Sequence, residues 1–364
     1  MRLPVLAPGE IPAPEKYIPR KGVESRVPMN HTAFRIAERR YKGRKTPIDF
    51  SQVIDPRKGH ELLEKMEYKV SKEYKWKDFG NRAFGAWSVK GMPGFIVIPE
   101  ALNEQEQKEL AKKCYTSYIE PPNLNSLDRI FSIPSKGLWK SMVENTPIYE
   151  YEKSENESSG YDTDVPYATQ YKNDKRKKKE TPVVDVENAI RRLRWIILGY
   201  PYNWYTKEYD FNSTFKAVPL ELNLICKTLS EMLGFGPYEA EAGIVNFYQE
   251  KDTLMGHVDR SEKNMNAPLF SISLGQSAIF LIGGKTREDP VIPILLRSGD
   301  IAILSGESRW FYHGVPRIIE NSLPEYFMDC CDCGNEENHS FDCWKLVSHY
   351  LKGTRLNINI RQVN

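Results

Sequence analysis

A histidine and an aspartate stand two residues apart in the segment MGHVDRSE, residues 255–262. If this segment is extended, His257 and Asp259 point to the same side, because side chains alternate between the two faces of a strand. An imidazole and a carboxylate on one side are two of the three ligands of a non-haem iron(II) site. A chance His-x-Asp pair is the alternative, so the interpretation depends on a third ligand elsewhere in the chain.

The third ligand that the sequence offers is His313, one of only 6 histidines. It follows the apolar segment IAILSG (301–306), which is predicted to be a strand, so it would lie at the mouth of a β-barrel. Two histidines and one carboxylate form the facial triad of Fe(II) oxygenases. This triad leaves three neighbouring positions on the metal, two for a chelating keto acid and one for O2.

The C-terminal segment RLNINIRQV contains side chains suited to binding such an acid. Alternation places an apolar row on one face and a polar row on the other: Leu356, Ile358 and Ile360 against Arg355, Asn357, Asn359 and Arg361. The two arginines, about 20 Å apart along the strand, could grip a small dicarboxylate, because a guanidinium binds a carboxylate bidentately. Asn246 and Tyr248, also two apart, are predicted to hydrogen-bond the same co-substrate. The alternative is an amphipathic strand with its polar face in water.

The composition limits what the rest of the chain can do. Of 364 residues, 40% are hydrophobic and 27% are charged, which is typical of a globular protein, and no apolar run is long enough to span a bilayer. The formal net charge is only +2, so any affinity for nucleic acid must come from local basic patches. We expect a monomer that does not associate with membranes.

The two ends of the chain differ sharply in pattern. Residues 1–90 read as a proline-rich tail followed by a helical extension, with a basic helix at residues 33–41. Residues 241–364 read as short strands joined by glycine-containing turns. This pattern favours an antiparallel barrel or a double-sheet jelly roll as the catalytic core.

Residues 91–240 are predicted to hold support helices. An apolar run at residues 93–99 predicts a strand, and Asn103 with Glu106 predicts a capping box that opens a helix. The polar stretch near 152–180 has almost no aliphatic residues, so we expect a disordered insertion there.

A Cys-rich insertion near 320–343 interrupts the catalytic core. Its possible zinc ligands are Cys330, Cys331, Cys333 and Cys343, with His339 nearby. The CCDC spacing is not that of a zinc knuckle, and no secretion signal favours disulfides. Reduced thiols in a flexible insertion are therefore the preferred interpretation over a zinc site.

The segment RRLRWIILGYPYNW, residues 191–204, interleaves basic and aromatic side chains. Such a pattern is typical of phosphate contact combined with base stacking. Trp195, Tyr200 and Tyr202 are the candidates for stacking. For Trp195 and Trp204, the end of a helix followed by a core strand is an equal alternative.

Together, NFY, HVD, a distant histidine and RLNINIR resemble the AlkB family of Fe(II)/2-oxoglutarate-dependent nucleic-acid dioxygenases. Their order and spacing agree with that family, and segments such as LGQSAIF and HGVPRI are most similar to AlkB homologue one of animals. The resemblance runs from about residue 91 to the C-terminus. It implies an α+β fold with a double-stranded β-helix (jelly-roll) core, flanking helices and a nucleotide-recognition lid.

The resemblance also implies a role for each site residue. The iron ligands would be His257, Asp259 and His313. The 2-oxoglutarate contacts would be Asn246, Tyr248, Arg355, Asn357 and Arg361. The contacts to the substrate base would be Trp195, Tyr200, Tyr202, Ser261 and Glu262. The bacterial archetype has an acidic residue where this chain has Ser261, a departure that argues against alkylation repair of the bacterial kind and fits the animal subfamily.

The implied activity is oxidative demethylation or oxidation of methylated bases, with Fe(II) bound and 2-oxoglutarate and O2 as co-substrates. The resemblance points to tRNA carrying 1-methyladenine or 5-methylcytosine, and secondly to N6-methyladenine in locally unpaired DNA, because a base inside a duplex is out of reach. The expected location is intracellular, in the nucleus or mitochondrion, with the cytoplasm as an alternative. Two other classes stay open: an oxygenase acting on a protein such as a histone lysine, and a catalytically silent nucleic-acid-binding module.

Overall fold

The computed structural model describes residues 31–364 except for residues 46, 71–75, 145, 152–177, 184–185, 205, 214–215 and 329–342. The predicted N-terminal tail, most of the predicted insertion near 152–180, and the cysteines Cys330, Cys331 and Cys333 lie outside the described residues. For residues 178–180 the prediction of disorder is wrong, because they begin strand β7 (Lys178–Val183), which pairs with β6 (Ile148–Tyr151). No helix in the described ranges is long and apolar enough to cross a membrane.

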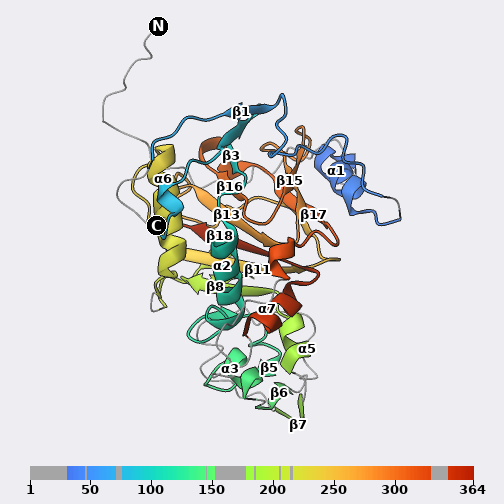
Figure 1. Ribbon diagram of the computed structural model, residues 1–364, viewed down its shortest axis with the longest axis vertical. Helices are drawn as coiled ribbons and strands as arrows, with labels where there is room; N and C mark the ends of the chain where they lie inside the picture. The colour runs from blue at the N-terminus through green and yellow to red at the C-terminus, as the bar shows by residue number, and fades with distance from the viewer. Residues whose placement is uncertain are drawn as a thin grey trace.

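Two antiparallel sheets form the core, as the predicted jelly roll requires (Figure 1). The large sheet has nine strands, in the order β1 (Leu63–Lys65), β2 (Trp87–Val89), β3 (Met92–Ile98), β16 (Ile301–Leu304), β13 (Leu269–Gly275), β18 (Thr354–Arg361), β11 (Ala242–Gln249), β8 (Trp195–Gly199) and β4 (Leu124–Asn125). The small sheet has four, in the order β12 (Leu254–His257), β17 (His313–Ile318), β14 (Ala278–Ile282) and β15 (Ile292–Leu296). The large sheet therefore extends beyond the predicted core segment 241–364.

Three helices cover the outer face of the large sheet (Figure 1). They are α2 (Glu104–Thr116), α6 (Leu220–Leu233) and α7 (Cys343–Leu351). Helix α2 begins with the predicted capping box, in which Asn103 accepts from the Glu106 amide and Glu106 accepts from the Asn103 amide. The apolar residues of these helices pack against one row of β18, which consists of Leu356, Ile358 and Ile360. That row faces the helices as predicted, so the polar row of β18 faces the space between the sheets.

Helix α1 (Ala33–Lys42) packs on the small sheet, at the side opposite α2 and α6 (Figure 1). Phe34 is fully buried and lies over Gly256 and Gly283, where a Cβ atom would meet its ring. The carboxylate of Glu38 accepts a hydrogen bond of 2.6 Å from the Gly256 amide. The N-terminal extension is thus attached to the strand that carries His257.

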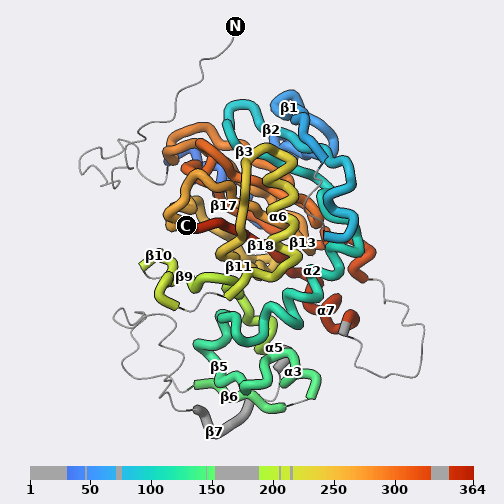
Figure 2. The backbone as a smooth tube through the Cα atoms, turned by 90° about the vertical axis from the view of Figure 1, so that its left-hand side faces the viewer, coloured from blue at the N-terminus to red at the C-terminus, as the bar shows by residue number. Residues whose placement is uncertain are grey.

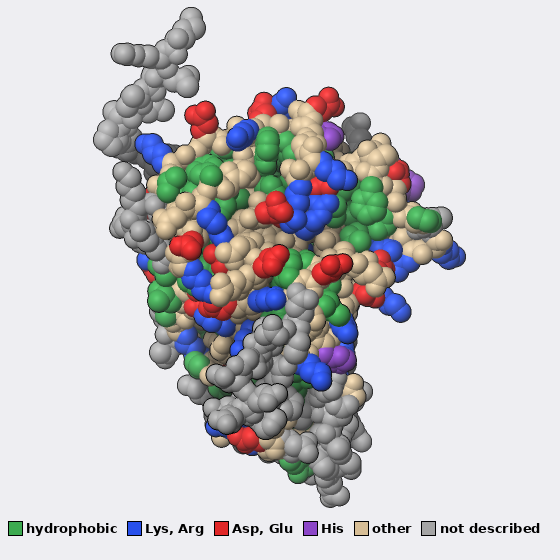
Figure 3. All heavy atoms as spheres, in the orientation of Figure 1, with side chains coloured by type: hydrophobic (Ala, Val, Ile, Leu, Met, Phe, Trp, Pro, Cys, Tyr) green, Lys and Arg blue, Asp and Glu red, His purple; other side chains and the backbone are tan. Residues whose placement is uncertain are grey.

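Two small sheets lie outside the core. The hairpin of β9 (Tyr202–Asn203) and β10 (Glu208–Tyr209) occupies the predicted lid segment, and Figure 2 shows it on the side where the C-terminus lies. The other sheet joins β5 (Phe131–Ser132), β6 and β7 beside the short helices α3 (Leu138–Val143) and α5 (Val186–Arg191). On the face seen in Figure 3, the described acidic and basic side chains are intermixed, in keeping with the low net charge.

Candidate active site

Three side chains that are distant along the sequence meet between the two sheets. His257 ends β12 and His313 begins β17, and these two residues are paired partners in the small sheet. Asp259 follows two residues after β12, with Oδ1 3.6 Å from Nε2 of His257 and Oδ2 3.6 Å from Nε2 of His313. The three ligand atoms all lie within 4.8 Å of one another. This spacing suits three ligands of one metal ion.

The histidine rings are oriented by their own backbone. The Nδ1 atom of His257 lies 2.9 Å from the Met255 carbonyl, and that of His313 lies 3.2 Å from the Phe311 carbonyl. A carbonyl can only accept, so each Nδ1 carries the proton and each Nε2 presents a lone pair to the site. Both imidazoles therefore offer the atom that a metal ion needs.

The charge states also suit a divalent cation. Burial, with the neighbouring His313, lowers the pKa of His257 and favours the neutral ring. For Asp259, burial would raise the pKa, but the positive charge of Arg361 outweighs it and holds the pKa well below its usual range. The site therefore combines one carboxylate with two imidazoles, the donor set of iron(II) oxygenases.

An enclosed cavity adjoins the triad, between the two sheets. Its walls combine polar side chains of the large sheet and the triad with apolar side chains from both sheets. The lining residues are Tyr248, Leu254, His257, Asp259, Leu269, Ser271, Phe280, Leu304, His313, Val315, Arg355, Asn357 and Asn359. Of the predicted 2-oxoglutarate contacts, Tyr248, Arg355 and Asn357 line this cavity. Asn246 is the partner of Asn357 in the neighbouring strand, but it is not among the lining residues.

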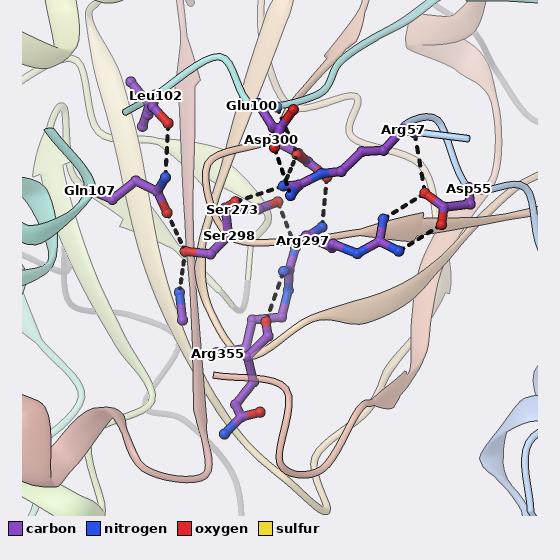
Figure 4. A network of polar contacts seen from close by, with 12 residues as sticks. Asp55, Arg57, Glu100, Leu102, Gln107, Ser273, Arg297, Ser298, Asp300 and Arg355 are labelled. Carbon is purple, nitrogen blue, oxygen red and sulfur yellow. Dashed lines mark hydrogen bonds and ion pairs between the residues drawn. The ribbon is translucent and has the colours of Figure 1, made fainter. Parts of the chain in front are cut away.

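Arg355 is a buried cation, with only 2% of its surface exposed. It donates to Ser273 Oγ at 2.8 Å and to the Gln276 carbonyl at 3.3 Å, and its Nε atom has no hydrogen-bond partner among the described residues. Figure 4 shows Ser273 connecting Arg355 to a polar network that includes Arg57 and the buried Asp300. Burial lowers the pKa of Arg355 to about 10. A buried guanidinium that lacks a carboxylate partner fits the remote carboxylate of 2-oxoglutarate.

Two supporting serines were missed by the sequence analysis. Ser273 accepts from Arg355, and Ser271 accepts from Asn357 at 2.8 Å. The segment FSISLG held the signal, because alternation that buries Phe270, Ile272 and Leu274 on one face directs both serines to the other face, where Ser271 lines the cavity. Their small hydroxyls leave room for the longer side chains that they orient.

The lid brings only some of the predicted substrate contacts to the site. The hydroxyls of Tyr202 and Ser261 lie 3.1 Å apart, which places Tyr202 beside the loop that follows Asp259. Tyr200 instead packs edge-on against Phe211, with ring centroids 5.1 Å apart. Trp195 is a residue of strand β8, and its ring lies 5.7 Å from that of Trp204. Trp195 thus lies in a strand, as one alternative expected, but it is only half-buried, and its contact with a base stays a prediction.

Glu262 is not placed for contact with a base. Its side chain is only 2% exposed, and its oxygens lie 3.1 Å from Nη2 of Arg309 and 3.0 Å from Nε of Arg361. The Tyr209 hydroxyl donates to the same carboxylate at 3.2 Å. Two buried cations and a phenol occupy the carboxylate, so the expected role in substrate binding does not fit this position. Arg361 likewise contacts Asp259, with Nη2 2.9 Å from Oδ2, and does not line the cavity.

The jelly-roll core and the triad beside a buried arginine define the class of this protein, an Fe(II)- and 2-oxoglutarate-dependent oxygenase. The model of the 2OG-Fe(II) oxygenase superfamily matches residues 163–361. The DNA N(6)-methyladenine demethylase ALKBH1A of Arabidopsis thaliana is 32% identical over 356 residues, which cover 92% of this chain and 96% of the plant protein. The chain belongs to the AlkB family of this superfamily and is similar to its ALKBH1 members.

Two further relatives support this membership. Nucleic acid dioxygenase ALKBH1 of Homo sapiens is 33% identical over 288 residues, which cover 76% of this chain and 66% of the human protein. The tRNA demethylase abh1 of Schizosaccharomyces pombe is 30% identical over 342 residues, or 91% of this chain and 95% of the yeast protein. The solved structure of OsALKBH1 aligns with 76% of this chain at a TM-score of 0.44 and 17% identity.

Proposed function

We propose that this protein oxidatively demethylates, or oxidises, methylated bases in nucleic acid. The observation that carries the proposal is the convergence of His257, Asp259 and His313 beside the buried Arg355, which has no carboxylate partner among the described residues. Family membership and the names of the three relatives support the choice of nucleic acid as substrate. A protein-directed oxygenase would have no need of the aromatic hairpin whose Tyr202 contacts the loop that follows Asp259.

Each residue of the site has a task in this reaction. The triad would hold iron(II), and Arg355 with Tyr248 and Asn357 would hold 2-oxoglutarate by the carboxylate remote from the metal. When bound, iron and 2-oxoglutarate supply the oxidation of a C–H bond by O2. Arg361 keeps the Asp259 carboxylate ionised and oriented through its 2.9 Å contact. The apolar part of the cavity wall excludes water from the reacting atoms.

The substrate base must be unpaired to enter this site. The cavity lies between two sheets, and a base that is stacked in a duplex cannot reach it, so the enzyme must use loops or extrude the base. Tyr202, held against Ser261 beside the metal ligand Asp259, is the aromatic residue best placed to contact an extruded base. We favour tRNA with 1-methyladenine or 5-methylcytosine, and we take N6-methyladenine in unpaired DNA as the second candidate.

The test is mass spectrometry of nucleosides from tRNA and single-stranded DNA after incubation with enzyme, iron(II), 2-oxoglutarate and O2. We expect loss of a methylated nucleoside, with production of succinate that depends on the nucleic acid. The His257→Ala variant is the matched control. With this variant, the methylated nucleoside should remain and no succinate should form. Turnover of a methylated histone peptide, with every methylated nucleoside unaffected, would favour the protein-directed oxygenase instead. Binding without any turnover would favour the catalytically silent module.

The proposed substrates also bear on location and assembly. Since tRNA and DNA are found inside the cell, we infer an intracellular site of action, in the nucleus or mitochondrion. We further propose that the protein works as a monomer, because a single chain supplies all three ligands and Arg355. Light scattering of the protein, alone and mixed with tRNA, tests this stoichiometry.

A further inference from the structure

Arg309 is an almost fully buried arginine whose guanidinium is held by several hydrogen bonds. It lies in the 3-10 helix η3 (Gly306–Trp310), only four residues before the ligand His313, and 1% of it is exposed. Its guanidinium donates to the Ala267 carbonyl at 3.1 Å, to the Asp259 carbonyl at 3.3 Å and to Glu262 Oε2 at 3.1 Å. All three acceptors belong to residues 258–268, the loop that joins β12 to β13. One side chain thus ties the loop that contains Asp259 to the segment that leads to His313.

Glu262 extends this contact to the last strand. While its Oε2 atom accepts from Arg309, its Oε1 atom lies 3.0 Å from Nε of Arg361. Arg361 in turn binds Oδ2 of Asp259 at 2.9 Å. The result is a buried row of alternating charge, in the order Arg309, Glu262, Arg361 and Asp259, in which each cation faces a carboxylate. The desolvation of four charges is tolerated only because they are paired.

Asp259 depends on this row more than the two histidines do. His257 and His313 are paired residues of the small sheet, so backbone hydrogen bonds help to fix their positions. Asp259 lies two residues beyond the end of β12, in the loop. The buried row contacts Asp259 at two points. Arg309 donates to the Asp259 carbonyl, and Arg361 donates to the Asp259 carboxylate.

The lid is connected to the same row. The hydroxyl of Tyr209, on strand β10, donates to Glu262 Oε1 at 3.2 Å and accepts from Nη1 of Arg361 at 3.3 Å. The lid hairpin is therefore hydrogen-bonded to the groups that orient the metal ligand.

We propose that Arg309 and Glu262 are positioning residues that act together as a clamp on the metal ligand Asp259. Glu262 fixes the guanidinium of Arg361, and Arg309 fixes both Glu262 and the backbone of Asp259. Without the clamp, the Asp259 carboxylate would not be held at the spacing that the two imidazoles require. The proposal rests on the metal-binding part of the proposed function and is independent of the nucleic-acid substrate.

The test is titration of the metal-free protein with Co(II), followed by the absorption of the bound metal, with no substrate present. Glu262→Gln keeps the shape of the side chain and removes its charge. We expect the affinity for Co(II) to fall by about 10- to 100-fold, the usual effect of losing a group that orients a metal ligand. Arg309→Lys, which keeps the charge but loses the planar fork, should weaken Co(II) binding by a smaller factor and is the milder variant if Glu262→Gln does not fold.

A matched control separates positioning from stability. Glu106 is also a fully buried glutamate in an ion pair, 2.5 Å from Arg82, but it belongs to helix α2 outside the site. Glu106→Gln should lower the melting temperature and leave the Co(II) affinity unchanged. If folded Glu262→Gln or Arg309→Lys protein binds Co(II) as tightly as wild type, the clamp is refuted. If His313→Ala also leaves Co(II) binding unchanged, the assignment of the metal site is refuted together with the clamp.

Discussion

Replacing Arg355 by methionine should stabilise the protein in the absence of 2-oxoglutarate. The same replacement should prevent 2-oxoglutarate from binding. Burial lowers the pKa of Arg355 to about 10, and at about 1.4 kcal/mol per unit the charged form costs the fold about 3 kcal/mol. Because the folded-state pKa lies below the unfolded-state pKa, this cost is present at every pH below about 10. Methionine removes the cost and loses two hydrogen bonds, to Ser273 and Gln276, worth about 1 kcal/mol each. The expected net gain is therefore about 1 kcal/mol.

Thermal unfolding of the metal-free protein measures this gain, and a second scan with Mn(II) and 2-oxoglutarate measures ligand binding. Wild type should be stabilised by 2-oxoglutarate, and Arg355→Met should not. Arg309→Met is the matched control, because Arg309 is equally buried but has a carboxylate partner, so its loss should cost about 3–5 kcal/mol. If ligand-free Arg355→Met loses as much stability as Arg309→Met, then Arg355 is an ordinary structural cation and the reasoning is refuted.

Three other substitutions test the surroundings of the site. Phe34→Ala should weaken the packing of α1 on the small sheet by about 3–5 kcal/mol. It should also raise the rate of amide hydrogen exchange in β12, whose Gly256 amide donates to Glu38; an unchanged rate there would contradict the attachment of α1 to β12. Asp55→Asn should lower stability by about 1–3 kcal/mol at pH 7, since hydrogen bonds from Arg297 lower the pKa of Asp55; denaturant melts should show this difference shrinking as pH falls through that lowered pKa, and a constant difference would refute it. Gly94→Ala should lower the melting temperature, because φ is +83° and a Cβ would lie 1.9 Å from the Ser305 carbonyl; an unchanged value would refute this.

The fold could be predicted from the sequence because its signals are local. Alternation along RLNINIR separates a core row from a polar row, and the structure places Leu356 among the helices and Arg355 in the cavity, whereas Arg361 pairs with Asp259 outside the cavity. The capping box of α2 depends on only two residues, Asn103 and Glu106, three positions apart. Such features need no knowledge of what the segment packs against.

The errors arose where a residue's role depends on distant partners. The family resemblance implied that Glu262 contacts the substrate, but Arg309 and Arg361, from other parts of the chain, pair with its buried carboxylate. Residues 178–180 are too polar to suggest a strand, yet β6 supplies the pairing. The attachment of α1 to β12 also joins residues more than 200 positions apart. Pairings of this kind leave no periodic signal in one sequence.

Strand β18 shows why stability and co-substrate binding can be changed separately in this fold. Its outward row is part of the largest apolar cluster, so a large-to-small change at Ile358 should cost about 2–5 kcal/mol. Its inward row instead holds the buried Arg355 without a carboxylate and Arg361 with two. The cost of leaving Arg355 unpaired is offset elsewhere in the fold until a carboxylate enters the cavity. A binding site of this kind gains affinity because the ligand relieves an unfavourable charge that the folded protein already contains.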